Sequence, residues 1–247
     1  MPTHDVTITT TDGECAASLH VPDGDGPWPG VLLYPDAGGY RPTFRTMGDE
    51  LASSGFVVLV PDIYYRSGGY EPFDMTTAFS DEDELGRLLA LIGDLTSERY
   101  LADAETFVTY LQERDDVVDG PVGTTGYCLG GRLSLHVAGH LGERVGAAAS
   151  FHGGRLAVEG DPDSPHLVAT QVRSEVYVGA ARDDGSFDAE QAERLAAAYD
   201  AASVVATIEE YPALHGFAVP DNPTYDERAA ARHRDATRAL FERALPR

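Results

Sequence analysis

Short apolar runs alternate with amphipathic segments along most of the chain. Segment 43–54 places Phe44, Met47 and Leu51 three and four residues apart, which predicts a helix, and Gly55 suits its C-terminus. Other amphipathic segments predict helices at 96–114, 129–141, 189–201 and 225–245. The apolar runs predict strands at 31–34, 56–60, 122–125, 145–150, 175–179 and 204–209.

Two regions depart from this alternation. Residues 6–10 and 16–21 flank the Asp12-Gly13 pair, which predicts an antiparallel hairpin. Residues 63–95 are rich in aromatic and acidic side chains and are predicted to be a long irregular stretch. Such stretches in a compact domain are usually functional lids or mobile segments. The acidic run at 81–84 is either the charged start of a helix or a solvated loop.

Strands that alternate with helices predict an α/β protein, with a mostly parallel central sheet flanked by helices on both faces. Sites in such sheets lie at the carboxyl ends of the strands. The 247 residues contain no visible repeat or interdomain linker, so we expect a single domain over residues 1–247.

The charge of the chain narrows the classes of partner. With 41 acidic and 18 basic residues the formal net charge is −23, which disfavours nucleic acids and anionic membranes as partners.

The two cysteines, Cys15 and Cys128, are too few for a disulfide scaffold. No signal peptide or long apolar span is visible, so a soluble cytoplasmic protein is expected, with a monomer as the default.

The segment Gly126-Tyr127-Cys128-Leu129-Gly130 joins a predicted strand to a predicted helix. This is the spacing of a nucleophile elbow, with Cys in place of the commoner Ser. The turn places Cys128 at a helix N-terminus, which stabilises a thiolate. The Leu129 N–H would face a developing oxyanion. The alternative interpretation is a buried structural cysteine in a glycine-rich turn.

An acidic residue and a histidine follow in the chain order of α/β-hydrolases. Asp183 and Asp184 come after the strand at 175–179, and His215 follows the next strand. His215 would deprotonate Cys128 and later protonate the leaving group, while the acid fixes the imidazole tautomer. Spacing does not decide between the two aspartates.

Four segments of the chain resemble the dienelactone hydrolases, an α/β-hydrolase family. They are Tyr34-Pro35-Asp36-Ala37-Gly38-Gly39, Pro61-Asp62-Ile63-Tyr64-Tyr65-Arg66, Gly126-Tyr127-Cys128-Leu129-Gly130-Gly131 and His215-Gly216-Phe217-Ala218. The resemblance implies an α/β-hydrolase fold with Cys128 as nucleophile. It also selects Asp184, because the family's acid lies three residues before an apolar residue, here Phe187.

The resemblance extends to residues around the nucleophile. The family has an acidic residue, usually Glu, that activates the nucleophile, and Asp36 occupies that position. The N–H of Ala37 matches the family's second oxyanion donor, beside that of Leu129. Asp36 is one methylene shorter than Glu, which weakens the expectation of direct contact with the thiol.

The substrate-binding residues depart from the family pattern. Members that hydrolyse dienelactone hold its carboxylate with arginines, one of them four residues after the catalytic histidine, where this chain has Val219. Arg66 and Arg87 are the candidates to replace it, and Arg66 lies in a matching segment. Tyr64 and Tyr65 are expected to line the pocket.

These residues predict a hydrolase of small esters or lactones that forms an acyl-thioenzyme on Cys128 and needs no cofactor and no metal. Neutral substrates are expected to react at least as well as dienelactone, because the net charge repels anions. His136 and His140 share a helix face, but buried structural histidines are the favoured interpretation. The rival functions are another acyl hydrolase, such as a thioesterase or peptidase, and a non-catalytic protein with a reactive thiol.

Overall fold

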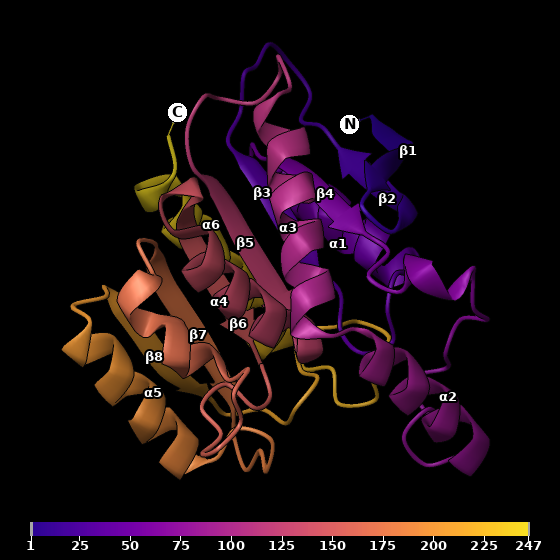
Figure 1. Cartoon of the computed structure of the whole chain (residues 1–247), viewed down its shortest axis with the longest axis vertical. Coiled ribbons are helices and arrows are strands. Elements are labelled where there is room, and N and C mark those ends of the chain that lie inside the picture. Colours follow the sequence, from indigo (N-terminus) through magenta and orange to yellow (C-terminus); the bar gives the residue numbers. More distant parts are fainter. Residues whose placement is uncertain (1, 247) are drawn as a thin grey trace.

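A computed structural model describes residues 2–246, and its centre is one eight-stranded sheet (Figure 1). The strands are β1 (Thr3–Thr10), β2 (Gly13–His20), β3 (Gly30–Tyr34), β4 (Val57–Pro61), β5 (Val122–Tyr127), β6 (Val145–Phe151), β7 (Glu175–Ala181) and β8 (Ala206–Tyr211). The α-helices are α1 (Pro42–Ala52), α2 (Glu82–Asp94), α3 (Ser97–Gln112), α4 (Leu129–Leu141), α5 (Ala189–Ala201) and α6 (Glu227–Ala244).

The sheet has the strand order β1-β2-β4-β3-β5-β6-β7-β8. β1 and β2 form the predicted hairpin, and β2 pairs antiparallel with β4. All pairs from β4 to β8 are parallel. Helices α3, α4 and α5 cover one face, while α1 and α6 cover the other (Figure 1). This arrangement confirms the predicted α/β fold with its mostly parallel sheet.

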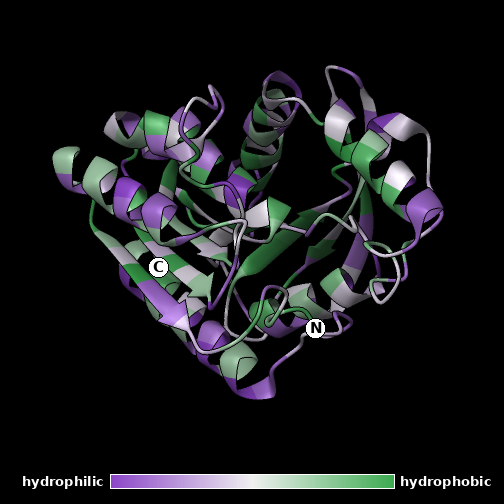
Figure 2. Ribbon diagram, turned by 90° about the horizontal axis from the view of Figure 1, so that it is seen from below, coloured by the Kyte–Doolittle hydropathy of each residue, from purple (hydrophilic) through white to green (hydrophobic). Residues whose placement is uncertain are grey.

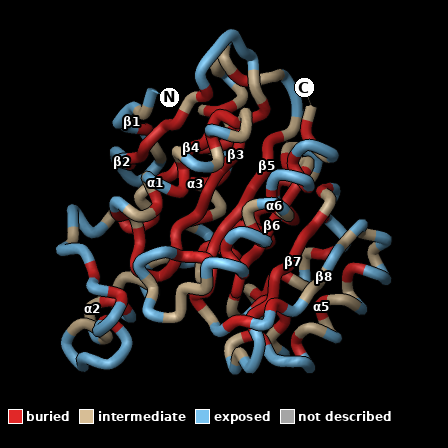
Figure 3. The backbone as a smooth tube through the Cα atoms, turned by 180° about the vertical axis from the view of Figure 1, so that it is seen from behind, coloured by how far each residue is buried: buried red, intermediate tan, exposed pale blue. Residues whose placement is uncertain are grey.

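Successive residues of the central strands enter two separate cores. Leu32 and Leu59 pack on the face of α3 and α4, whereas Val31 and Val58 pack on the face of α1 and α6. The alternation arises because neighbouring side chains of a strand point to opposite faces. With both faces covered, these strands read as continuous apolar runs. Figures 2 and 3 show the apolar, buried strands between the more polar helices.

The prediction for residues 63–95 is wrong over α2. Asp81 caps this helix, since its carboxylate accepts hydrogen bonds from the N–H groups of Asp83 and Glu84, both at 3.0 Å. The acidic first turn interacts favourably with the helix dipole, so the run at 81–84 begins a helix. Leu88 is the fully buried residue of α2, which stands out from the rest of the molecule (Figure 1).

Helix α6 is the longest helix, with 18 residues, and it carries several arginines. Within residues 2–246, no helix is both long enough and apolar enough to span a membrane.

Candidate active site

The chain turns sharply at Cys128, between β5 and α4. Cys128 has φ of 52°, in the left-handed region that non-glycine residues rarely adopt. A Cβ added at Gly126 would lie 2.1 Å from the carbonyl oxygen of Gly130, and one at Gly130 would lie 2.3 Å from that of Pro35. Only glycine therefore fits at either position. The strained turn lifts the Cys128 side chain above the end of the sheet, as expected for a nucleophile elbow.

Two backbone N–H groups lie beside this turn. Leu129 is the first residue of α4, so its N–H has no acceptor within the helix. Ala37 lies in the loop after β3, which the close approach of Gly130 brings against the elbow. The hydroxyl of Tyr64 donates to the carbonyl oxygen of Ala37 at 3.0 Å and braces this loop. Cys128, Ala37 and Leu129 all line one cavity.

His215 and Asp184 come together at the same end of the sheet. Nδ1 of His215 lies 2.6 Å from Oδ2 of Asp184, and Ser186 donates its N–H and its hydroxyl to Oδ1 of Asp184 at 2.9 and 2.7 Å. Asp183 points away: its side chain is 82% exposed and pairs with Arg182 at 3.5 Å. The structure thus places Asp184, and not Asp183, against His215.

The surroundings of His215 favour its charged form. Burial by itself would lower the pKa of the imidazole, but hydrogen bonds with Asp184 and Cys128 outweigh burial and raise that pKa to about 10. Burial also opposes the charge of Asp184, yet the bond to His215 holds its pKa below the usual value. A positive imidazolium beside the Asp184 carboxylate is therefore the stable arrangement.

His152, in the turn after β6, is a neighbour of His215. Its ring centroid lies 5.1 Å from that of His215, and φ of 39° is again left-handed. The side chain is buried, and neither ring nitrogen has a hydrogen-bond partner among the described residues. Burial and the charge of His215 keep its pKa well below the usual value, so it packs against His215 as a neutral ring.

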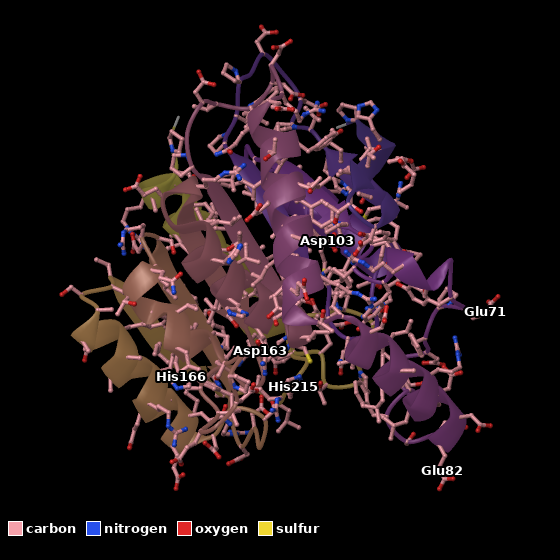
Figure 4. All side chains as sticks on the ribbon, viewed as in Figure 1. Glu71, Glu82, Asp103, Asp163, His166 and His215 are labelled. Atoms are coloured by element: carbon pink, nitrogen blue, oxygen red, sulfur yellow. The ribbon has the colours of Figure 1, made fainter. Side chains whose placement is uncertain are left out.

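A cavity of about 720 Å³ opens at these residues. Its wall around α2 is mainly apolar, whereas another part carries polar side chains, among them Arg132 and Asp163. Figure 4 labels His215 and Asp163, which both line the cavity near the N-terminal end of α3. Other lining residues are Phe79, Ile92, Leu95, Tyr100, Leu133, Arg132, Arg155 and Ser186.

Asp36 is buried and bound by an arginine instead of lying free at the nucleophile. Arg41 donates to both oxygens of Asp36 at 2.6 and 2.9 Å, and the N–H of Gly38 donates to Oδ1. Arg41 also binds both oxygens of Asp221 at 2.8 Å. The expected activating contact from Asp36 is therefore replaced by an ion pair. That pair ties the Ala37 loop to the loop after His215.

Arg66 and Tyr65 were expected to bind substrate, and this expectation is wrong because neither residue lines the cavity at Cys128. Arg66 donates to both oxygens of Asp103 at 2.7 and 2.8 Å and also binds Asp12. The Tyr65 hydroxyl donates to Asp103 at 2.9 Å. These residues join the β1–β2 hairpin to α3. Tyr64 lies behind the Ala37 loop and supports it from outside the cavity.

Three further candidates have partners elsewhere. Arg87 bonds to Glu84 and to the Glu71 carbonyl on the outer side of α2. His140 lies 3.0 Å from Glu105, and His136 lies 2.5 Å from the Tyr100 hydroxyl. His136 is buried, as predicted, whereas His140 is exposed, so the prediction of a buried residue is wrong for His140.

Comparison with known proteins places this site in a family. A Pseudomonas carboxymethylenebutenolidase is 29% identical over 95% of this chain and 92% of its own. A Synechocystis protein provisionally given the same name is 27% identical over 97% and 96% of the two chains. A Klebsiella pneumoniae crystal structure, provisionally named a dienelactone hydrolase, superposes with a TM-score of 0.83 at 24% identity, covering 98% of each chain. The sequence model of the dienelactone hydrolase family matches residues 15–245, so this chain belongs to the dienelactone hydrolase family of α/β-hydrolases.

Proposed function

We propose that the protein hydrolyses small esters and lactones with Cys128 as nucleophile, His215 as acid and base, and Asp184 as the residue that orients His215. The observation that supports this most is the hydrogen bond between Asp184 and His215 at the cavity that Cys128 also lines, with Cys128 close enough to raise the pKa of His215. The backbone strain at Cys128 and its place at the N-terminus of α4 add to this support.

The positions of these groups support the following reaction. The Cys128 thiolate, whose proton is held by the His215 imidazolium, attacks the ester carbonyl, and the N–H groups of Leu129 and Ala37 stabilise the oxyanion of the tetrahedral intermediate. His215 then protonates the leaving alcohol oxygen and becomes neutral, and an acyl-thioenzyme remains. His215 next takes a proton from water, whose oxygen attacks the thioester carbonyl. The carboxylic acid leaves, and the Cys128 thiolate and the His215 imidazolium are restored.

Uncharged substrates fit this cavity best. Val219, which stands where the family's carboxylate-binding arginine would be, is fully buried in the apolar core. Arg66 and Arg41 are bound by carboxylates away from the cavity, and the two arginines that line it, Arg132 and Arg155, are both paired with Asp161. The apolar side chains of Phe79, Ile92 and Leu95, in and around α2, line one wall. A neutral lactone or ester loses little solvation on entering such a site, whereas an unpaired carboxylate loses much.

Hydrolysis of a panel of lactones, alkyl esters and their carboxylate analogues tests this proposal, with wild type and Cys128→Ala compared. Turnover of neutral substrates should fall by roughly 10⁴-fold or more in the variant, because nucleophile and base act as a unit. Mass spectrometry of wild type mixed with a slow ester should show an acyl adduct on Cys128. Undiminished turnover by Cys128→Ala would rule out the mechanism.

The rival functions give different results in the same panel. Thioesters or peptides hydrolysed much faster than esters would identify another acyl hydrolase. Stoichiometric alkylation of Cys128 by iodoacetamide without turnover of any substrate would identify a non-catalytic reactive thiol. Cys15 is the internal control for alkylation, because burial strongly raises the pKa of its thiol and it is inaccessible.

A further inference from the structure

One end of the active-site cavity carries a cluster of polar side chains that the proposed reaction does not use. Arg132 lies on α4 four residues after Cys128, which is one helical turn, or about 6 Å along the same face. Tyr100 from α3 and Asp163 from the loop after β6 line the cavity with it. The three residues come from separate parts of the chain, and they face a space whose other wall is apolar.

Arg132 is held in place by several acceptors. Its Nη2 donates to a carboxylate oxygen of Asp161 at 3.1 Å and to the carbonyl of Asp163 at 3.2 Å. Nη1 donates to the carbonyl of Arg155 at 3.4 Å. A guanidinium has five N–H donors, two more than these three acceptors use. Two donors therefore remain to Arg132, which lines the cavity.

The cluster is balanced in charge. Arg155 also donates to Asp161, at 2.9 Å, so the two arginines are matched by Asp161 and Asp163. Tyr100 is only 6% exposed, and its hydroxyl is fixed 2.5 Å from Nδ1 of His136. A ligand group that reaches this end meets a donor on Arg132 and an acceptor on Asp163. A carboxylate would be repelled by Asp163, and an alkyl group would leave both unused.

We propose that Arg132 and Asp163 form a subsite for an uncharged group that both donates and accepts hydrogen bonds, such as a hydroxyl or an amide, on the substrate. The inference rests on the proposed hydrolase function and specifies its substrate class: esters or lactones with a remote neutral polar group. The subsite positions that group while the carbonyl carbon lies at Cys128.

Matched substrates test the subsite through ratios of kcat/KM. One series varies the acyl part of a p-nitrophenyl ester, with 6-hydroxyhexanoyl, hexanoyl and 5-carboxypentanoyl groups. A second series places the same end groups on the alcohol of an acetate ester. In at least one series, the kcat/KM of wild type should be about three- to tenfold higher for the hydroxyl substrate than for the alkyl substrate, because one net hydrogen bond contributes that much. The kcat/KM for the carboxylate substrate should be the lowest of the three.

Two variants test Arg132 and Asp163 separately, each through a different ratio. Arg132→Met should reduce the hydroxyl-to-alkyl ratio to about one. Asp163→Asn keeps the side-chain shape but removes the negative charge, so the carboxylate-to-alkyl ratio should rise about tenfold. Arg238→Met and Asp235→Asn are the matched controls, because this exposed pair lies on α6 across the sheet and should leave every ratio unchanged.

The outcomes separate the subsite from the hydrolase itself. Wild-type turnover with ratios that neither variant alters would overturn the subsite and leave the proposed function standing. Absence of turnover for every ester and lactone would overturn both. Thermal melting of each variant guards against misfolding, and because ratios compare substrates on one protein sample, partial unfolding does not change them.

Discussion

Two regions of this molecule place a histidine between a carboxylate and a thiol or hydroxyl. In the first, His215 lies between Asp184 and Cys128. In the second, Nδ1 of His20 lies 2.8 Å from Asp49 and Nε2 lies 2.8 Å from the Ser18 hydroxyl. By residue type and hydrogen bonding alone, the second region is a serine–histidine–aspartate triad.

The two sets of residues share this pattern of partners but differ in burial, backbone conformation and pKa. Ser18 and His20 are fully buried, and a Cβ on Gly48 would lie 2.6 Å from Nε2 of His20, so no substrate reaches them. Ser18 sits inside β2, whereas Cys128 sits on a strained turn at a helix N-terminus and lines a cavity. Burial lowers the pKa of His20, while the partners of His215 raise its pKa.

Three residues with matching hydrogen bonds do not by themselves make an accessible site. A cavity, N–H groups at the start of a helix and surroundings that raise the pKa of the histidine are found at Cys128 and not at Ser18. These come from the backbone and from neighbouring loops. The Ser18 region instead satisfies buried polar atoms, which is the ordinary role of such a network.

Removal of the aspartate carboxylate should affect the two regions very differently. Asp184→Asn should lower kcat by roughly 10³–10⁴-fold, because the imidazole loses its orientation and the partner of its charge. Asp49→Asn should keep activity within about twofold and cost about 1 kcal/mol of stability, the value of one hydrogen bond. Ester kinetics and urea denaturation of both variants measure this. Equal losses of activity would show that the Ser18 region supports catalysis.

A second prediction compares the two buried arginine clusters. Arg41→Met leaves Asp36 and Asp221 without their partner, so stability should fall by about 3–5 kcal/mol. Activity should also fall, by roughly 10²-fold, because the Ala37 loop and the loop after His215 lose their link.

The matched variant for Arg41 is Arg66→Met, which also breaks a buried ion pair but one that serves the hairpin. It should lose stability without loss of kcat/KM in the folded protein. If Arg66→Met instead abolished turnover of a carboxylate-bearing lactone alone, Arg66 would have a substrate-binding role after all.

The pH dependence of stability should differ in sign between the two histidines. The pKa of His215 is raised from 6.5 to about 10, so its stabilising contribution is complete below pH 6.5 and is lost as pH rises towards about 10. The pKa of His20 is lowered from 6.5, so its contribution is present above pH 6.5 and is lost as pH falls below it.

NMR titration of the imidazole signals, assigned with His215→Gln and His20→Gln, measures both directions. His215 should stay charged through neutral pH while His20 stays neutral. A His215 that titrates near 6.5 would contradict the charged imidazolium on which the proposed reaction depends.

Local pattern in the sequence determined much of this protein. The apolar runs identified the strands of the sheet, because strands covered on both faces need apolar residues throughout. The glycines around Cys128 predicted the elbow, since no larger residue fits the turn. The chain order of Cys128, an acid and His215 predicted which strand ends meet. Helix α2 was missed because the acidic run at 81–84 suits a helix start and a solvated loop equally.

Only the tertiary structure decided which side chains face the cavity. Asp183 and Asp184 are adjacent, so local spacing does not determine which one faces a histidine some 30 residues later. The family resemblance selected Asp184, and the structure has Asp184 against His215. Arg66 and Asp36 were assigned to the site by their segments, but Asp103 and Arg41 bind them instead. Long charged side chains bind the nearest opposite charge in space, and that neighbour is set by how distant segments pack.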